Sequence, residues 1–287
     1  MKNKIELYKD YLINWLRDWF NANGADCQAV IGVSGGKDST TIAALCCEAL
    51  DPWRVIGVLM PNGNQKDIED SYAVVKHLGI RHVEINIEDA YNGILNQFAG
   101  NNMIESEQTK VNLPPRLRMA TLYAVAQSMN GRVVGTSNLD EYMLGWQTRF
   151  GDSVSDVEPI IKLHANEVVE LGLALGVPEY LMRKEPTDGL GEVVKSDADK
   201  MGFTYQEFQD FYERHHGQMD LRYEGEMLTD KEEKMWQMYR KSEFKRRPIP
   251  EPPYYPGYFD EPSESFDAAE CNTDDNEDRT KEESHDR

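Results

Sequence analysis

Four short, almost entirely apolar runs alternate with segments of helical periodicity, and this alternation restricts the fold more than any other feature of the chain. The runs are AVIGV (29–33), WRVIGVLM (53–60), RHVEINI (81–87) and RVVGT (132–136). A strand that is buried on both faces is apolar at nearly every position, and strands separated by helices pair in parallel. The pattern therefore predicts an α/β fold: a doubly wound, mostly parallel sheet with helices on both faces, of the Rossmann-like type.

The segments between and after these runs place apolar side chains three and four residues apart, which is typical of amphipathic helices. Helices are predicted over residues 5–19, 38–50, 65–78, 117–129, 166–175, 205–213 and 231–241. The first of these is rich in aromatic residues and fits a core helix and a subunit interface equally well. Residues 183–203 are polar and are expected to form a loop, and the proline-rich 248–258 is expected to be extended.

The charge of the chain is unevenly distributed. The net charge is −20 over 287 residues, and residues 258–287 hold twelve Asp and Glu against three Lys and Arg. This composition predicts a globular domain over residues 1–257 and an acidic, disordered tail over 258–287. A nucleic-acid partner is not expected, because phosphate-backbone binding needs a basic face.

The cysteines and the hydropathy of the chain indicate in which cellular compartment the protein is expected. The four cysteines, Cys27, Cys46, Cys47 and Cys271, include no CxxC pair, so reduced thiols and no zinc site are expected. No run approaches the ~20 apolar residues of a membrane span, and the N-terminus has no signal-peptide core. These features predict a cytoplasmic protein that does not enter the membrane.

The stretch SGGKDS (34–39) joins the first apolar run to the helix that follows it. A glycine-rich turn at the carboxyl end of a parallel strand lets backbone N–H groups approach an anion, and the helix N-terminus adds partial positive charge. A capped strand–helix turn without a ligand is the simpler alternative. Asp38 favours a ligand site, because a carboxylate beside phosphate oxygens calls for a cation such as Mg²⁺ between them.

SGGKDS resembles the PP-loop, SGGxDS, of the ATP pyrophosphatases. Four further stretches resemble motifs of NH₃-dependent NAD synthetase within that superfamily: PRLRMATLYAVAQ (115–127), VVGTSNLDEYMLGWQTRFGD (133–152), KEPTDGL (184–190) and SEFKRRPIP (242–250). They occur in the family's order with matching spacing, and the resemblance spans roughly residues 5–255. Taken together, these motifs are far more specific than the loop alone.

The resemblance implies a ligase that forms a C–N bond in two steps. The carboxylate of deamido-NAD (nicotinic acid adenine dinucleotide) attacks the α-phosphorus of ATP and releases pyrophosphate. Ammonia then displaces AMP and leaves NAD. The resemblance also implies Mg²⁺ and a homodimer. No separate region is long enough for a glutaminase domain, so free ammonia is the expected nitrogen donor.

The same resemblance implies residue roles. Asp38 and Glu141 are the implied magnesium ligands, and together with Lys245 they are the candidate catalytic residues. The implied ATP-binding residues are Gly32, Val33, Ser34, Gly35, Gly36, Lys37, Asp38, Ser39, Thr136 and Thr187. The implied contacts to deamido-NAD are Arg116, Arg149, Asp156, Phe244 and Lys245.

The chain departs from the family pattern at several of these positions. Arg149 stands where the family has lysine, and Phe244 stands where it has histidine. A lysine of the family that contacts ATP phosphates falls at Ala165. Lys162 and His164 are the nearby replacements, although neither is in frame. Lys37, at a position where the family often has glutamine, is the candidate for a compensating charge.

Two other functions stay open on the sequence alone. One is amidation or thiolation of a different substrate by the same PP-loop chemistry. The other is nucleotide binding by a chain that kept the fold but lost catalytic power, because the lysine expected at residue 165 is absent.

Overall fold

The computed structural model describes residues 3–65, 68–183, 196–215, 219 and 227–252. It divides into two units, Met1–Pro248 and Ile249–Arg287, and the first contains every helix and strand discussed below. Within the described ranges, no helix combines the length and the apolar character needed to cross a bilayer.

The sheet has four parallel strands in the order β3-β2-β1-β4. Their bounds are β1 Gln28–Gly32, β2 Val55–Leu59, β3 Arg81–Glu84 and β4 Gly131–Val133. Val30 of β1 lies opposite Ile56 of β2 on one side and Val133 of β4 on the other. Because all strands are parallel, their carboxyl ends meet at one edge, which is where the loop 34–39 begins.

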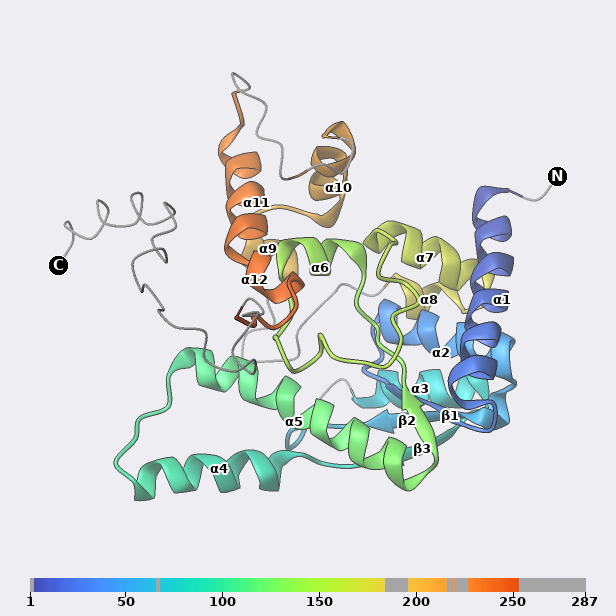
Figure 1. Cartoon of the computed structure of the whole chain (residues 1–287), viewed down its shortest axis with the longest axis horizontal. Helices are drawn as coiled ribbons and strands as arrows, with labels where there is room; N and C mark the ends of the chain where they lie inside the picture. Colours follow the sequence, from blue (N-terminus) through green and yellow to red (C-terminus); the bar gives the residue numbers. More distant parts are fainter. Residues whose placement is uncertain (1–2, 66–67, 184–195, 216–218, 220–226, 253–287) are drawn as a thin grey trace, which may run out of the picture. The chain divides into compact units, whose positions relative to one another are not determined.

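The helices follow the strands in alternation (Figure 1). Their bounds are α1 Lys4–Gly24, α2 Lys37–Leu50, α3 Ile68–Leu78, α4 Glu88–Gly100, α5 Glu107–Ser128, α6 Leu139–Leu144, α7 Ala165–Ala174, α8 Glu179–Met182, α9 Asp197–Met201, α10 Tyr205–Arg214, α11 Asp230–Lys241 and α12 Glu243–Arg246, with a 3₁₀ turn at Pro52–Arg54. The predicted α/β fold is confirmed.

Two apolar layers cover the two faces of the sheet. Ala29 and Ile31 of β1 pack in one buried cluster with α1, α2, α3, α7 and α8, whereas Val30 and Val133 pack in another with α5. Side chains along a strand point alternately to the two faces, so both layers draw on the same strand. The aromatic α1 is a core helix: Leu16 and Phe20 are fully buried, and Trp15 and Trp19 pack against the same cluster.

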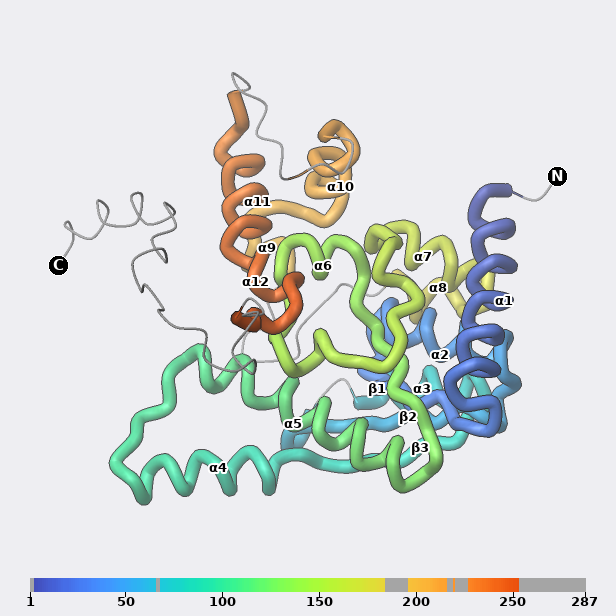
Figure 2. The backbone as a smooth tube through the Cα atoms, in the orientation of Figure 1, coloured from blue at the N-terminus to red at the C-terminus, as the bar shows by residue number. Residues whose placement is uncertain are grey.

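A third cluster lies apart from the sheet and joins α6 to α9, α10 and α11. Figure 2 shows the C-terminal helices α11 and α12 beside α6, although they are far from it in the sequence. Phe203, Phe208 and Met235 are buried in this cluster. Its packing holds α6 from the side opposite the sheet, which matters because α6 carries Glu141.

The structure differs from the sequence prediction mainly in three segments, and the short helices α6, α8 and α12 were not predicted either. α5 begins at Glu107, ten residues earlier than predicted, and continues through Pro114 and Pro115. The prolines remove N–H donors and interrupt the apolar repeat, which hid the first part of the helix. α4 was not predicted. Residues 183–203 are not only loop, because Ser196 caps the short helix α9.

Candidate functional site

The loop 34–39 turns sharply at glycine. Gly35 has φ of +77°, a conformation that costs a residue with a side chain. A Cβ at Gly35 would also lie 2.6 Å from Cβ of Asp70 and 2.9 Å from the backbone of Ser71. The loop therefore packs backbone to backbone against the start of α3, and only glycine fits.

Hydrogen bonds within the loop fix its shape. The Ser39 hydroxyl accepts from the backbone N–H of Ser34 at 3.2 Å and donates to the carbonyl of Gly36 at 3.1 Å. The Ser34 hydroxyl accepts from the N–H of Gly36 at 3.3 Å. Gly36 is the N-cap of α2, with no side chain to satisfy the N–H groups of the first turn. Those N–H groups are thus left to face an anion.

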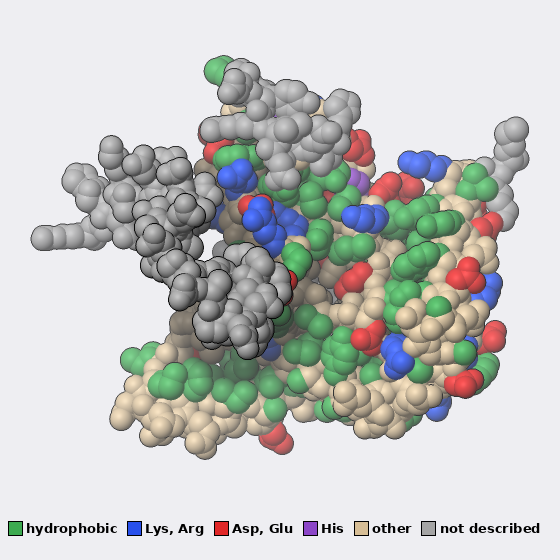
Figure 3. All heavy atoms as spheres, in the orientation of Figure 1, with side chains coloured by type: hydrophobic (Ala, Val, Ile, Leu, Met, Phe, Trp, Pro, Cys, Tyr) green, Lys and Arg blue, Asp and Glu red, His purple; other side chains and the backbone are tan. Residues whose placement is uncertain are grey.

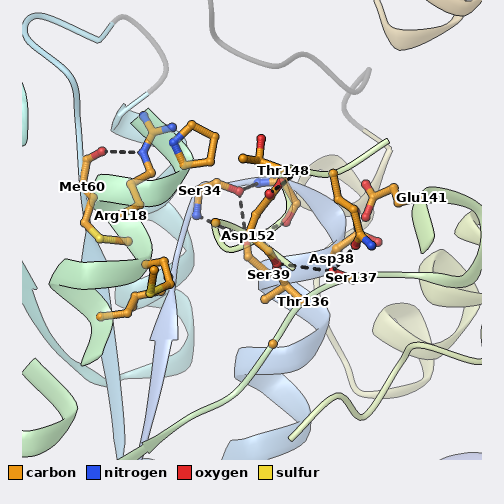
Figure 4. Close-up of a pocket in the computed structure, with 18 of the residues that line it drawn as sticks. Ser34, Asp38, Ser39, Met60, Arg118, Thr136, Ser137, Glu141, Thr148 and Asp152 are labelled. Atoms are coloured by element: carbon orange, nitrogen blue, oxygen red, sulfur yellow. Dashed lines mark hydrogen bonds between the residues drawn. The ribbon is translucent and has the colours of Figure 1, made fainter. Parts of the chain in front are cut away.

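A cavity of about 610 Å³ opens above this loop. Its lining includes the loop, the ends of β1 and β2, one side of α5 and residues 133–137 and 145–152. Figure 4 shows Asp38 and Glu141 together on one side of the cavity, across from Arg118 and Met60. The volume is in the range of sites that hold a nucleotide-sized ligand.

Asp38 and Glu141 follow the carboxyl ends of the neighbouring strands β1 and β4, and Asn138 links them. The amide of Asn138 donates to Oδ1 of Asp38 at 3.1 Å, and its Oδ1 accepts from the N–H of Glu141 at 3.0 Å. Glu141 and Asn138 form the capping box of α6. Burial, and then the nearby Asp38 carboxylate, raise the pKa of Glu141 well above its usual value.

Lys37 lies within this group of carboxylates. Its Nζ is 2.6 Å from Oδ2 of Asp38 and 5.7 Å from the ring centre of Tyr205. The Tyr205 hydroxyl donates to Oδ2 of Asp197 at 3.0 Å. Burial opposes the charged form of Lys37, but the attraction of Asp38, Glu141 and Asp197 outweighs it, so the pKa of Lys37 is raised.

The donor set fits a magnesium ion that is completed by substrate oxygens. Magnesium in nucleotide sites takes one or two protein carboxylates together with water and phosphate oxygens. Asp38 and Glu141 supply two carboxylates whose mutual repulsion is visible in the raised pKa of Glu141. Among the described residues, no three His, Cys, Asp or Glu side chains converge on one point, so an all-protein metal cage is not present there.

The predicted Arg116, Arg149 and Phe244 are not among the described residues that line the cavity, although Arg149 and Phe244 adjoin Thr148 and Lys245, which do. We call Arg149, Phe244 and Lys245 the rim. The Arg149 guanidinium lies 4.9 Å from the ring centre of Phe150 and 5.5 Å from that of Phe244. Arg116 donates to the carbonyl of Arg149 from two guanidinium nitrogens, each at 3.4 Å. The two departures from the family pattern, at positions 149 and 244, are therefore in contact with each other.

Lys245 lines the cavity and is held by backbone carbonyls. Its Nζ donates to the carbonyls of Gly145 at 2.7 Å and Gln147 at 2.6 Å. Burial lowers the pKa of Lys245. Its neighbour Arg246 donates to the carbonyls of Met143 and Tyr239 and so ties α12 to α6 and α11. Figure 3 shows Lys and Arg side chains gathered in this region.

Gly32, Val33 and Thr136 also line the cavity, as the sequence predicted. Asp156 is not among the described residues that do so. Its carboxylate accepts from the N–H of Val133 at 2.8 Å and from the Tyr123 hydroxyl at 3.3 Å. The structure thus gives Asp156 a role in holding the end of β4. Thr187 lies outside the described residues.

The surroundings of Ala165 show which of the candidate replacement cations lies at the cavity. Ala165 is buried as the first residue of α7, and its N–H donates to Oδ2 of Asp140 at 2.8 Å. Oδ1 of Asp140 is 2.5 Å from Nδ1 of His164. Lys162 is exposed. Of the two replacements named from the sequence, His164 is therefore committed to Asp140 and Lys162 does not line the cavity, whereas Lys37 does.

Three charged residues of the described cavity lining were not singled out from the sequence. Arg118 donates to the carbonyl of Met60 at 3.0 Å, and Asp152 accepts from the N–H of Thr148 at 2.6 Å. Asp197 reaches the cavity from the start of α9. Arg118 and Asp152 lie inside quoted motifs, so those motifs carried a signal. Asp197 had none, because the helix that positions it fell in a segment read as loop.

Comparisons with known proteins agree with this geometry. A family model described as NAD synthase matches residues 8–249. An NH(3)-dependent NAD(+) synthetase of Finegoldia magna is 36% identical over 211 residues, covering 73% of this chain and 84% of that protein. One from Pyrococcus horikoshii is 37% identical over 226 residues, covering 76% and 85%.

A solved structure of NMN synthetase from Francisella tularensis superposes with a TM-score of 0.76 at 32% identity, covering 88% of this chain and 100% of that one. The matched segment of the family model includes the loop 34–39, α6 and the rim. The chain therefore belongs to the NAD synthase family.

Proposed function

We propose that this protein is a ligase that converts deamido-NAD to NAD with ammonia, consuming ATP and releasing AMP and pyrophosphate. The proposal is carried by one observation. The family match coincides with a cavity in which a glycine loop, a helix N-terminus and two carboxylates from neighbouring strands converge. That combination suits attack of a carboxylate on a nucleoside triphosphate.

The loop is proposed to bind the pyrophosphate part of ATP. N–H groups at the start of α2 face the cavity, and Ser34 and Ser39 hold the loop in shape by mutual hydrogen bonds. Asp38 and Glu141 would hold Mg²⁺, which when bound offsets the negative charge of the phosphates and of the attacking carboxylate. Thr136 lines the same wall and is proposed to contact ATP.

The rim is proposed to bind the second substrate. The Arg116 guanidinium bonds to the backbone carbonyl of Arg149, whose own guanidinium lies over Phe244. Planar guanidinium groups suit carboxylate and phosphate oxygens. Lys245 is half-buried beside them, and its pKa is lowered by burial. Thr187 keeps its proposed role in ATP binding from the sequence alone.

The activity is tested with deamido-NAD, ATP, Mg²⁺ and ammonium. We expect NAD, AMP and pyrophosphate in equal amounts, and far less product when glutamine replaces ammonium. Formation of ADP instead of AMP would overturn the proposal, and so would ATP binding without any pyrophosphate release. The second result would favour the nucleotide-binding alternative.

A specific observation favours a second substrate, nicotinic acid mononucleotide. The Francisella tularensis structure that covers 88% of this chain is an NMN synthetase. The same adenylation and amidation on a mononucleotide would yield NMN. The two candidates are separated by measuring kcat/KM for deamido-NAD and for nicotinic acid mononucleotide in one preparation. We expect the larger value for deamido-NAD, and the reverse order would reassign the substrate.

A homodimer is proposed from the exposed apolar surface of α4 and the turn after it. α4 has no fully buried residue, although it is amphipathic. Met103 and Ile104 are 53% and 95% exposed, and Val111 is 49% exposed. On the face seen in Figure 3, the region of α4 and α5 displays apolar side chains with few charged ones. A second copy of the chain would cover this surface.

The dimer is tested by light scattering after size exclusion. We expect twice the chain mass, and a shift towards the monomer for Ile104→Asp. A monomeric wild-type protein would overturn it. The cytoplasmic location stays a prediction from the sequence.

A further inference from the structure

Lys37 takes up a position that its place in the helix does not explain. Neighbouring residues on a helix point in different directions and do not normally meet. Nζ of Lys37 nevertheless contacts Oδ2 of the adjacent Asp38 at 2.6 Å. The two side chains are only 10% and 17% exposed. The lysine side chain is thus folded back into the cavity rather than extended into solvent.

The surroundings of the ammonium group are those of a cation site. Asp38 contacts it directly, and the carboxylates of Glu141 and Asp197 are close enough to stabilise its charge. The Tyr205 ring lies 5.7 Å away, and its hydroxyl is bonded to Asp197, so the ring is fixed in place. An aromatic face adds to the attraction for a cation.

The other cations of the described lining are committed elsewhere. Lys245 donates to the carbonyls of Gly145 and Gln147. Arg118 donates to the carbonyl of Met60. Among the described residues that line the cavity, Lys37 is therefore the cation that neutralises Asp38 and Glu141.

Both oxygens of Asp38 are already engaged. Oδ2 meets the ammonium of Lys37, and Oδ1 accepts from the amide of Asn138. A divalent cation on Asp38 and Glu141 would have to take the place of the ammonium, because two positive charges at that separation repel strongly. If the ammonium of Lys37 is displaced from Asp38, its positive charge has no partner unless another anion lies nearby.

ATP would supply that anion. Lys37 is the first residue of α2, at the helix end where the proposed function places the phosphates. Its flexible four-carbon stem allows the ammonium to move from Asp38 to a phosphate oxygen within the same loop.

We propose, as an extension of the function above, that Lys37 is a tethered cation that occupies the divalent-cation site of the nucleotide-free enzyme and transfers to the ATP phosphates when the metal binds. This transfer couples the binding of the metal to the binding of ATP. Coupling of this kind is reciprocal: ATP strengthens metal binding by the same factor as metal strengthens ATP binding. The charge missing at Ala165 is supplied from Lys37 in the bound state.

The test uses Mn²⁺, whose free concentration is measured by electron paramagnetic resonance, on the full chain without and with ATP. Wild-type protein should bind Mn²⁺ weakly alone and at least tenfold more tightly with a non-hydrolysable ATP analogue. Lys37→Gln should bind Mn²⁺ alone at least tenfold more tightly than wild type. The strengthening of Mn²⁺ binding by the analogue should be correspondingly smaller in this variant.

Three controls define the result. Lys76→Gln removes the same charge from an exposed position of α3 and should leave Mn²⁺ affinity unchanged. Asp38→Asn in the Lys37→Gln background should abolish the tight binding, which places the ion at Asp38. Lys37→Met replaces Lys37→Gln if circular dichroism shows that the latter does not fold.

Equal Mn²⁺ affinity of wild type and Lys37→Gln without nucleotide would overturn the proposal, and so would tight binding that survives Asp38→Asn. The measurement does not depend on turnover. If the expected Mn²⁺ result is obtained but no NAD or NMN is formed, the proposed function fails and the role of Lys37 stands. If NAD is formed but Mn²⁺ affinities are equal, the reverse holds.

Discussion

The floor and the rim of the cavity are built by different means. We define the floor as residues 34–39 and 135–141, and the rim as Arg149, Phe244 and Lys245. The floor is fixed by a left-handed glycine and by side chains that bond to the backbone of their own segment, in the loop and in the capping box of α6. The rim is fixed by side chains that stack on rings or donate to carbonyls.

The family motif is kept in the floor and is altered at two positions of the rim. SGGKDS and the Thr136–Glu141 spacing follow the family pattern, whereas positions 149 and 244 depart from it. A glycine with positive φ has no replacement, but a stacked pair can be exchanged for another pair. Substitutions in the floor should therefore cost more than substitutions in the rim.

Gly35→Ala should have the largest effect. The added methyl would meet the backbone of Ser71 at 2.9 Å, and the alanine would have to adopt φ of +77°. The loop or the start of α3 must move, so we expect at least a hundredfold loss of kcat/KM for ATP and a lower melting temperature. A steady-state assay at varied ATP concentration and thermal unfolding would measure the two effects.

Gly176→Ala is the matched control for this prediction. Gly176 has φ of +81°, but beyond its chain neighbours no atom lies within 4 Å of the place that a Cβ would occupy. It carries the same dihedral strain of about 1 kcal/mol without the clash. Similar losses of kcat/KM for ATP in the two variants would show that the contact with α3 does not define the floor.

Glu141→Gln should be the next most damaging. Glutamine keeps the capping box with Asn138, so α6 should stay folded. The variant loses the charge opposite Asp38, and we expect kcat to fall by about 10²–10³-fold. A steady-state assay checks this. If turnover were near wild type while the fold is intact, Glu141 would serve only as a helix cap.

The floor was largely predictable from the sequence, for a physical reason. Buried parallel strands must be apolar, and a loop between a strand and a helix needs glycine in fixed places, so both leave local signals. The pairing of Asp38 with Glu141 followed from the family resemblance. The partnership of Arg149 with Phe244 and that of Lys37 with Tyr205 did not, because each joins segments about a hundred residues or more apart with no shared pattern.

A third prediction concerns the support beneath the floor. Glu158 is partly buried and its carboxylate packs against Gly135. It accepts from the Ser155 hydroxyl at 2.6 Å and has no hydrogen-bond partner at Oε2 within the described residues. Burial raises the pKa of Glu158 from 4.5 to about 7. The native state therefore favours the neutral acid. Its stabilising contribution is complete below pH ~4.5 and is lost as the pH rises to about 7.

The substitution Glu158→Gln should remove the loss of stability that accompanies deprotonation of Glu158. The neutral amide mimics the protonated acid, so the variant should be more stable than wild type by about 3 kcal/mol at pH ~8 and similar to it at pH ~4.5. Urea unfolding at both pH values measures the difference. Glu48→Gln, an exposed position of α2, controls for the lost charge. Parallel pH profiles for wild type and Glu158→Gln would contradict the prediction.

The smallest effect of substitution is expected in the rim, where the two residues that depart from the family pattern, Arg149 and Phe244, contact each other. The stack of Arg149 on Phe244, with ring centre and guanidinium 5.5 Å apart, should contribute about 1 kcal/mol. Arg149→Lys and Phe244→His should each weaken the rim. The double variant, which restores both family residues, should cost less than the sum of the two by about that amount.

The cycle is measured on both the free energy of unfolding and kcat/KM for deamido-NAD. Coupling in kcat/KM would place the stack in substrate binding, because a purely structural contact affects only unfolding. Additive effects in both measurements would mean that positions 149 and 244 changed independently. In that case the effects of Arg149 and Phe244 would not depend on each other, in contrast to the coupled residues of the floor. The two departures from the family would then need separate explanations.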